Sequence, residues 1–326
     1  MPGHDVIVVG ASSGGVEALS RLAAQLPADL PASVFVVLHL LPHTPSVLAE
    51  ILDRAGPLRA CMPADGEPIV HGKIYVAPPD HHLIVKSDQV RLTRGPRENH
   101  NRPAIDPLFR SAAAAFRTRT IGLILSGSLD DGTSGLQAVK RCGGIALVQE
   151  PAEALYPDMP QNAINKVEVD YILPLAQMGS VLNELVLSPA PPPVPVPDDI
   201  LTEVRVAETG RGSIPVSDQL GMLTPYSCPD CGGPMWQMEH AAVPRFRCNV
   251  GHALSSQSLL IGQEEALDHA LWEAVRTMEQ RERLLQQMAE GERQAGRLQS
   301  AQVYEERAAE SQEHSQLIRE RLLRVK

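Results

Sequence analysis

The stretch Val6-Ile-Val-Val-Gly-Ala-Ser-Ser-Gly-Gly15 decides how the first part of the chain folds. Its opening run, Val6–Val9, is apolar and entirely β-branched, which predicts a short strand buried on both faces. Gly10 and the small residues after it predict a tight turn into a helix. The apolar residues that follow recur on one helical stripe (Val16, Leu19, Leu22 and Leu26). A buried strand that turns directly into a helix is typical of α/β folds.

The same alternation continues along the chain. Apolar runs at 34–38, 121–125 and 145–148 predict further buried strands, and helical patterns are found at 45–54, 106–116 and 133–141. Shorter runs at 74–76, 83–85 and 90–92 predict small, partly antiparallel strands. Strands buried on both faces and alternating with helices predict a doubly wound, mostly parallel, Rossmann-like α/β sheet.

Composition limits the class of protein. The chain has 326 residues, 43% of them hydrophobic, and a formal net charge of −10. The apolar content excludes wholesale disorder, and the acidic balance argues against nucleic-acid binding, which needs a basic face. There is no apolar run long enough to span a bilayer and no signal-peptide pattern at the N-terminus. We therefore expect a cytoplasmic protein that is not integral to a membrane.

A proline-rich stretch, Ser188-Pro-Ala-Pro-Pro-Pro-Val-Pro-Val-Pro197, marks the strongest boundary, because closely spaced prolines favour an extended spacer. Four regions are expected. They are the α/β domain at 1–187, a proline-rich linker at 188–225, a cysteine-containing module at 226–255 and a charged helical tail at 256–326.

The turn after the first strand admits three interpretations. It could be a dinucleotide-binding loop, but Ser12 stands where G-x-G-x-x-G needs its second glycine, and the second strand ends at His39 rather than at an acidic residue. Gly10–Gly14 also fits G-x-S-x-G, the turn that exposes a nucleophilic serine beside backbone N–H donors. The third interpretation is a plain glycine-rich turn in which a serine caps the helix.

The position of three polar residues favours the nucleophile. Ser12, His39 and Asp131 each follow a predicted parallel strand, so all three are expected at the carboxyl edge of the sheet. A serine nucleophile needs a histidine to take its proton and a carboxylate to orient the imidazole. Taken singly, His39 could be an ordinary strand-end histidine and Asp131 a turn or helix-cap residue. The order Ser-His-Asp along the chain also differs from that of α/β-hydrolases.

Several segments, in order, resemble the catalytic domain of the chemotaxis protein-glutamate methylesterases, the CheB family. The resembling segments are Val8–Gly15, Val37–His39, Tyr75–Leu83, Arg102–Phe109, Leu125–Gly132 and Tyr156–Ala163. The resemblance covers about residues 4–187. It implies a serine hydrolase that removes methyl esters from glutamate side chains of receptor proteins, and that also deamidates glutamines, with Ser12, His39 and Asp131 as the triad.

The resemblance also implies further site residues and partners. Ser13, Gly14 and Gly15 would lie around the oxyanion, and His81 and Ser128 near the substrate. Ser128-Leu-Asp130 stands where the family has methionine, glycine and asparagine. Asp130 would therefore add charge beside the triad acid and raise the pKa values of the cluster. Catalysis needs no cofactor. Because the resemblance begins at residue 4, a standalone form without a fused receiver domain is expected, with a separate regulator protein. The alternative function is a catalytically idle signalling scaffold.

A cysteine cluster suggests a metal. Cys228-Pro-Asp-Cys231 and Cys248-Asn-Val-Gly-His252 supply two ligand pairs of the kind that hold tetrahedral Zn²⁺. The alternatives are a redox C-x-x-C, which lacks the surrounding βαβ pattern, and buried apolar cysteines. Because the ligand set is closed, a structural role for zinc is expected, with Tyr226, Trp236 and Phe246 packed around it.

The tail is rich in Glu, Gln, Arg, Ala and Leu and predicts two helices, with a break flanked by Gly291 and Gly296. It could form a hairpin or coiled coil for dimerisation or partner docking. It could equally pack on its own chain.

Overall fold

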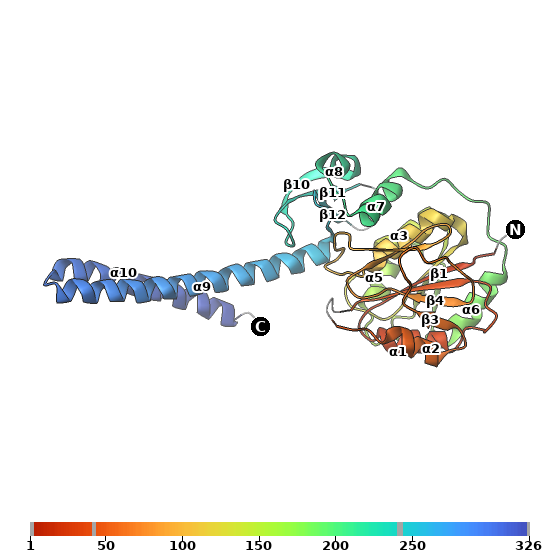
Figure 1. Ribbon diagram of the computed structural model, residues 1–326, viewed down its shortest axis with the longest axis horizontal. Helices are drawn as coiled ribbons and strands as arrows, with labels where there is room; N and C mark the ends of the chain where they lie inside the picture. The colour runs from red at the N-terminus through yellow and green to blue at the C-terminus, as the bar shows by residue number, and fades with distance from the viewer. Residues whose placement is uncertain (1–2, 41–43, 240–243, 325–326) are drawn as a thin grey trace. The chain divides into compact units, whose positions relative to one another are not determined.

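The computed structural model describes residues 3–40, 44–239 and 244–324, and it divides into two compact units, Met1–Leu259 and Leu260–Lys326. Figure 1 shows the elements in order along the chain. Among the described residues, no helix combines the length and the apolar character needed to cross a membrane.

The first unit is built on a seven-stranded sheet in the order β3-β4-β2-β1-β7-β8-β9, and every neighbouring pair is parallel. Its strands are β1 (Val6–Ala11), β2 (Ser33–Leu38), β3 (Arg59–Cys61), β4 (Lys73–Val76), β7 (Thr120–Ile124), β8 (Ile145–Gln149) and β9 (Tyr171–Leu173). This confirms the doubly wound parallel sheet. The strands at 83–85 and 90–92 are antiparallel as expected, but they form a separate hairpin, β5 (His82–Val85) with β6 (Val90–Thr93). The strand at 74–76 instead joins the main sheet.

Helices cover both faces of the sheet because successive residues of β1 point to opposite sides. Ile7 and Val9 pack with the helices of one face, α1 (Gly15–Ala23), α2 (Leu48–Ala55) and α6 (Leu175–Leu187). Val6 and Val8 pack with those of the other face, α3 (Ile105–Phe116), α4 (Thr133–Arg141) and α5 (Asp158–Lys166). Figure 1 shows α1 and α2 on one side of the sheet and α3 on the other.

The segment 198–225, predicted as linker, is largely helical, and that part of the prediction is wrong. It contains α7 (Asp198–Thr209), α8 (Ile214–Leu220) and the start of β10 (Gly221–Ser227). Ile200, Val206 and Ala207 are buried on one side of α7, and Gly210 ends that helix with φ 65°. Tertiary burial therefore orders a segment predicted to continue the proline-rich linker.

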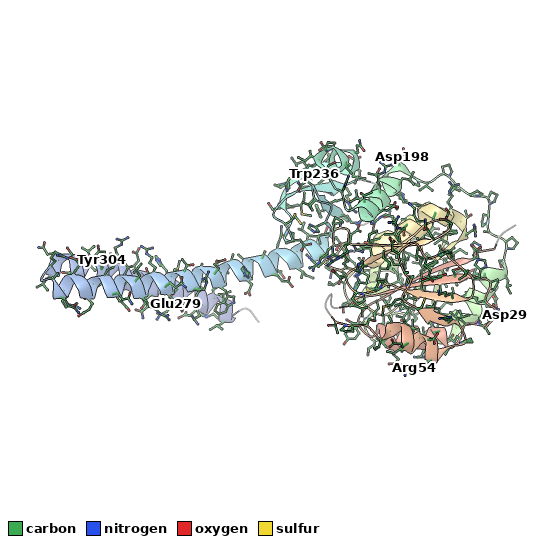
Figure 2. All side chains as sticks on the ribbon, in the orientation of Figure 1. Asp29, Arg54, Asp198, Trp236, Glu279 and Tyr304 are labelled. Atoms are coloured by element: carbon green, nitrogen blue, oxygen red, sulfur yellow. The ribbon has the colours of Figure 1, made fainter. Side chains whose placement is uncertain are left out.

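The cysteine region is a four-stranded antiparallel ribbon, which we call the ribbon: β10, β11 (Pro234–Met238), β12 (Arg245–Cys248) and β13 (Ala253–Ser255). It belongs to the first unit. Phe246 and Leu254 contribute to a small apolar core, and Tyr226 packs edge-on against Phe246. Trp236, labelled in Figure 2, is buried and donates its indole N–H to Asp218 at 2.8 Å. Phe246 and Tyr226 therefore pack in the cysteine module as expected, whereas Trp236 is buried outside its apolar cluster.

The second unit is a helical hairpin. It comprises most of α9 (Ser256–Gln294) and all of α10 (Leu298–Arg324). Arg319 pairs with Glu279 across the two helices, and Val275 and Ala308 are buried. The expected break exists, but Gly291 lies inside α9, and only Gly296, with φ 78°, falls between the helices.

Candidate functional site

The three predicted catalytic side chains follow three neighbouring strands. Ser12 comes directly after β1, His39 directly after β2, and Asp131 lies beyond the end of β7. Strand β1 lies between the other two, and the chain turns from β1 to one neighbour and later returns to the other. This reversal of strand order is where open α/β sheets form their sites. Backbone bonds from His39 N to Ala11 O (3.4 Å) and from Ser12 N to Ser126 O (3.0 Å) fix the strand ends against one another.

The three side chains form a continuous hydrogen-bonded chain. The Ser12 hydroxyl oxygen lies 3.0 Å from Nδ1 of His39, and Nε2 of His39 lies 2.7 Å from Oδ2 of Asp131. When Nε2 carries the ring proton toward Asp131, Nδ1 is free to accept the serine proton. The His39 side chain is 14% exposed and that of Asp131 only 2%. In this arrangement His39 can therefore take the proton of the Ser12 hydroxyl, and the buried carboxylate of Asp131 can stabilise the resulting imidazolium.

The turn at Ser12 is shaped by glycine. Gly14 takes the left-handed conformation, with φ 73°, and α1 begins at the next residue. Gly15 N donates to Ser12 O at 2.8 Å, so this amide is already engaged within the turn, and Gly15 stays a prediction as a residue of the oxyanion vicinity. Within the part of the chain that the structure describes, the amides of Ser13 and Gly14 form no hydrogen bond. These two amides remain as candidate donors.

Asp131 is held as a buried carboxylate. Its oxygens accept hydrogen bonds from side chains and from three backbone N–H groups: His39 Nε2, Asn99 Nδ2 (3.0 Å), Ile105 N (2.8 Å), Asp106 N (3.3 Å) and Gly132 N (3.0 Å). Burial alone would raise the pKa of Asp131. The hydrogen bonds from His39, Ile105 and Asn99 outweigh burial and hold that pKa below its usual value. The acid therefore stays ionised, contrary to the expectation that its neighbours raise its pKa.

A second buried carboxyl, Asp106, lies beside Asp131. Its Oδ1 accepts from Gly132 N (3.1 Å) and Gly135 N (2.6 Å), and its Oδ2 accepts from Asn99 Nδ2 (3.2 Å). Burial and the negative charge of Asp131 raise the pKa of Asp106 to about 7. The two adjacent carboxyls are therefore separated in pKa, with Asp131 lowered and Asp106 raised.

The departures from the family pattern lie at the same edge. Asp130 is buried, accepts from Ser255 Oγ at 2.8 Å, and has its pKa raised mainly by burial, as expected for this residue. Leu129 has φ 66°, a left-handed conformation that suits the family's glycine better than leucine. Ser128 is half-buried, two residues after Ser126, whose carbonyl accepts from Ser12 N.

His81 lies apart from these contacts. Its Nδ1 lies 3.0 Å from Pro79 O, and within the described residues no hydrogen bond or ion pair joins it to the triad. The neighbouring His82 is fully buried, and its Nδ1 accepts from Ala104 N at 3.3 Å, next to the amide that donates to Asp131.

A pocket opens beside the serine and the histidine. Its volume is about 430 Å³, and its walls include Ser12, His39 and the apolar side chains Val16, Leu38 and Pro45. A mostly apolar hollow of this kind suits an uncharged aliphatic side chain, with its reacting carbonyl at the serine.

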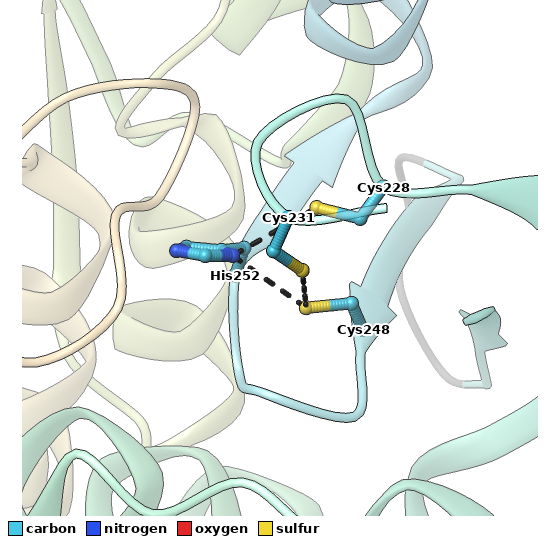
Figure 3. Close-up of side chains that lie close together, drawn as sticks. All are labelled: Cys228, Cys231, Cys248 and His252. Carbon is cyan, nitrogen blue, oxygen red and sulfur yellow. Dashed lines mark hydrogen bonds between the residues drawn. The ribbon is translucent and has the colours of Figure 1, made fainter. Parts of the chain in front are cut away.

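The four predicted metal ligands converge (Figure 3). Cys228 and Cys231 come from the turn between β10 and β11, Cys248 ends β12, and His252 precedes β13. Figure 3 shows the three sulfurs and the imidazole facing a common centre. The ligand atoms all lie within 4.8 Å of one another.

The distances suit a tetrahedral ion. Cys231 Sγ lies 3.7 Å from Cys248 Sγ, and His252 Nδ1 lies 3.6 Å from Cys248 Sγ and 3.8 Å from Cys228 Sγ. A tetrahedron with Zn–S bonds of about 2.3 Å has edges of about 3.8 Å. Tight turns hold the ligand pairs, because Gly232 N donates to Cys228 O and Gly251 N to Cys248 O. The residues therefore fit a closed, four-coordinate metal site.

Sequence reasoning misses Asn99 and Asp106, which contact the triad acid from another part of the chain. The signal for Asn99 is the polar run Glu98-Asn-His-Asn-Arg102 between a predicted strand and the start of α3, whereas Asp106 lies in the segment Arg102–Phe109 that carries the resemblance. Such a run could have marked a loop at the site. Nothing in it tells which side chain faces Asp131.

Comparisons with known proteins match the first part of the chain. A family model described as CheB methylesterase matches residues 7–182. A protein of Leptospira interrogans named for protein-glutamate methylesterase and protein-glutamine glutaminase is 33% identical over 183 residues, 56% of this chain and 95% of that protein. A Caulobacter vibrioides protein-glutamate methylesterase/protein-glutamine glutaminase is 37% identical over 180 residues, 54% of this chain and 52% of its own length. The crystal structure of the Thermotoga maritima CheB methylesterase catalytic domain is similar with a TM-score of 0.55 and 33% identity, over 57% of this chain and all of that domain.

Proposed function

The chain belongs to the CheB methylesterase family, and from that membership we propose that it hydrolyses the methyl esters of glutamate side chains on methylated receptor proteins. The single observation that supports this most directly is the hydrogen-bonded chain from Ser12 through His39 to Asp131. The relatives are named for glutamine glutaminase activity as well. Deamidation needs the same acyl chemistry, so we include it in the proposal.

The proposed reaction follows from the geometry. The Ser12 oxygen attacks the ester carbonyl while Nδ1 of His39 takes its proton, and Asp131 stabilises the imidazolium. The amides of Ser13 and Gly14 are the proposed donors to the oxyanion. His39 then protonates the departing methoxide, methanol leaves, and water cleaves the acyl-enzyme. No cofactor takes part.

The test is methanol release from a methylated receptor fragment. We expect release by the wild type and none above background for Ser12→Ala. Ser20→Ala is the matched control, because that hydroxyl lies on α1 and donates to Val16 O, away from the triad. Equal release by Ser12→Ala would contradict the proposal. A folded wild type that neither releases methanol nor reacts with a fluorophosphonate would favour the idle scaffold.

We also propose that Zn²⁺ occupies the Cys₃His site in a structural role, since thiolates and imidazole suit zinc and the ligand set is closed. A thiol cluster kept for a metal fits a reducing compartment, in keeping with the cytoplasmic location expected from the sequence. Stoichiometric zinc released from purified protein by a thiol-modifying reagent would support this assignment. Metal-free protein of unchanged stability would contradict it.

A further inference from the structure

Three consecutive residues of one loop are held by the ribbon. The Glu98 carboxylate pairs with Arg247 (3.0 Å) and Arg245 (3.2 Å) of β12, and all three side chains are at most 3% exposed. Asn99 N donates to Ala253 O at 2.8 Å, and Asn99 Oδ1 accepts from Ser255 N at 2.9 Å.

The third residue of this loop contacts the metal-binding turn itself. His100 Nδ1 lies 3.1 Å from Oδ1 of Asp230, which stands between the ligands Cys228 and Cys231. His100 Nε2 also lies 2.9 Å from Ser258 O. Loop residues 98–100 therefore face β12, β13 and the C-x-x-C turn in succession.

The middle residue of the loop reaches the catalytic acid. Asn99 Nδ2 donates to Asp131 Oδ1 at 3.0 Å, from a residue that is itself buried. Both Asn99 and His100 have left-handed backbones, with φ 48° and 63°. Such conformations persist in non-glycine residues when surrounding contacts hold them. The contacts that hold these two residues come largely from the ribbon.

The ribbon makes a second contact beside the acid. Ser255 Oγ donates to Asp130 Oδ1 at 2.8 Å, and Asp130 immediately precedes Asp131. Strand β13 therefore supports the catalytic acid in two ways, through Asn99 on one side and through the preceding residue on the other.

The ribbon in turn depends on its ligand cluster. Among the described residues, its buried apolar cluster comprises six residues, two of which, Cys228 and Cys248, are themselves ligands. A core of this size does not hold a small module without a metal or a similar cross-link. Of the other two ligands, His252 stands directly before β13, so the strand that supports Asn99 begins at the metal site.

We propose that the metal-bound ribbon positions Asp131 through Asn99, so that metal binding controls the hydrolase. The inference rests on the proposed function and names a regulation of the same site. Asn99 is a positioning residue, since it acts through Asp131 and, among the described residues, its side chain makes no hydrogen bond to Ser12.

The experiment compares the full-length wild type with Asn99→Ala, each zinc-loaded and after chelation, with metal content measured. A hydrogen bond to a charged group supports a loss of about tenfold to a hundredfold in kcat for Asn99→Ala, with KM unchanged. Chelated wild type should lose at least as much. Chelation should cost Asn99→Ala clearly less than it costs the wild type, because the route through Asn99 is already lost and only the contact of Ser255 with Asp130 remains. Zn²⁺ should restore the wild type to its full activity.

Asn165→Ala is the matched control, because that asparagine is exposed on α5 and bonds only to Gln161 among the described residues. It should keep both wild-type activity and its dependence on metal. Metal-free wild type with full kcat would overturn the inference. So would a chelated Asn99→Ala protein whose loss in kcat equals the product of the loss from chelation and the loss from the substitution. If chelation also unfolds the α/β sheet, the chelated proteins give no information on positioning. In that case an unchanged kcat in zinc-loaded Asn99→Ala would overturn the inference.

Failure of the proposed function gives a different result. Zinc-loaded wild type would then release no methanol. The same comparisons, measured as the rate at which a fluorophosphonate labels Ser12, would still decide whether the ribbon positions the triad.

Discussion

Asp131 is the residue on which the site converges. It accepts from His39, from Asn99 and from backbone N–H groups at the start of α3, so its charge is stabilised by groups from several elements. This makes the acid a fixed acceptor for one ring nitrogen of His39. The other ring nitrogen then faces Ser12.

Asp131→Asn tests this role. The new amide would donate to Nε2 of His39, so the ring proton would move to Nδ1, which could no longer accept the serine proton. We expect kcat for methanol release to fall by about 10³–10⁴-fold, as in triads on other folds, while circular dichroism shows a folded protein. A loss below about tenfold would remove Asp131 from the triad.

Asp106 gives a prediction for pH. Its pKa is raised to about 7 in the folded state from a usual value near 4, so between these values the folded protein binds a proton that the unfolded chain has released. Stability from this residue is complete at low pH and is lost as the pH rises through 7. Raising the pH from 5 to 7 should therefore lower the free energy of unfolding of the wild type more than that of Asp106→Asn. The two decreases should differ by about 2 kcal/mol.

Urea denaturation at the two pH values measures this difference. The histidines and metal ligands are the same in both proteins, so their contributions to the pH dependence cancel when the two proteins are compared. Equal pH dependence in the two proteins would show that Asp106 titrates normally.

At the residue scale, the hydrogen-bonded arrangement of Ser12, His39 and Asp131 could be predicted because each residue lies in the segment that follows a strand, and parallel strands bring their carboxyl ends to one edge. Asn99 and Asp106 could not be predicted in the same way. The role of Asn99 depends on a loop that contacts β13, more than 150 positions later in the chain, and that of Asp106 on backbone groups of Gly132 and Gly135. No local pattern carries that information.

At the element scale, a buried ionic network joins α3, α7, β12 and the loop at residue 98. It consists of Glu98, Glu203, Arg110, Arg245 and Arg247. Burial disfavours the charge on Glu98 and Glu203, but the three arginines outweigh this and lower the pKa of both carboxyls. The network therefore stays ionised and ties the ribbon to the α/β sheet.

Arg247→Met should be strongly destabilising. It leaves Glu98 and Glu203 buried with fewer partners, and removing one member of a buried ion network costs about 3–5 kcal/mol. The control is Arg21→Ala, which breaks an exposed 3.6 Å pair with Glu153 and should cost at most about 1 kcal/mol. Urea denaturation measures both. Similar small losses would mean that the network does not hold the ribbon.

The same network explains why the predicted linker fails beyond residue 197. The prolines do predict an extended spacer, but α7 places Glu203 in the buried network and Ile200 in the core of the sheet. The helical spacing of Ile200, Val206 and Ala207 was a usable signal. The buried arginine partners of Glu203 lie far from it in the sequence, so no local pattern shows that this residue is buried.

At the scale of the whole molecule, the compact units do not follow the predicted regions. The α/β sheet and the ribbon fall in one unit that ends at Leu259, and the hairpin forms the other. All three buried apolar clusters lie within the first unit. The first unit therefore contains the core that it needs to fold.

A chain of residues 1–266, which keeps about two helical turns after Leu259, should fold and keep its metal. Its melting temperature should lie within about 4 °C of that of the corresponding transition in the full chain. Calorimetry and metal analysis measure both. An insoluble or metal-free fragment would show that the first unit depends on the hairpin.

The central claim is that Ser12 is an activated nucleophile, and covalent labelling by a fluorophosphonate tests it most directly, because it needs no knowledge of the substrate. Mass spectrometry of the labelled wild type should find one label per chain, on Ser12, and none in His39→Ala. A label on another residue, equal labelling in His39→Ala, or a folded wild type that takes up no label would contradict the account.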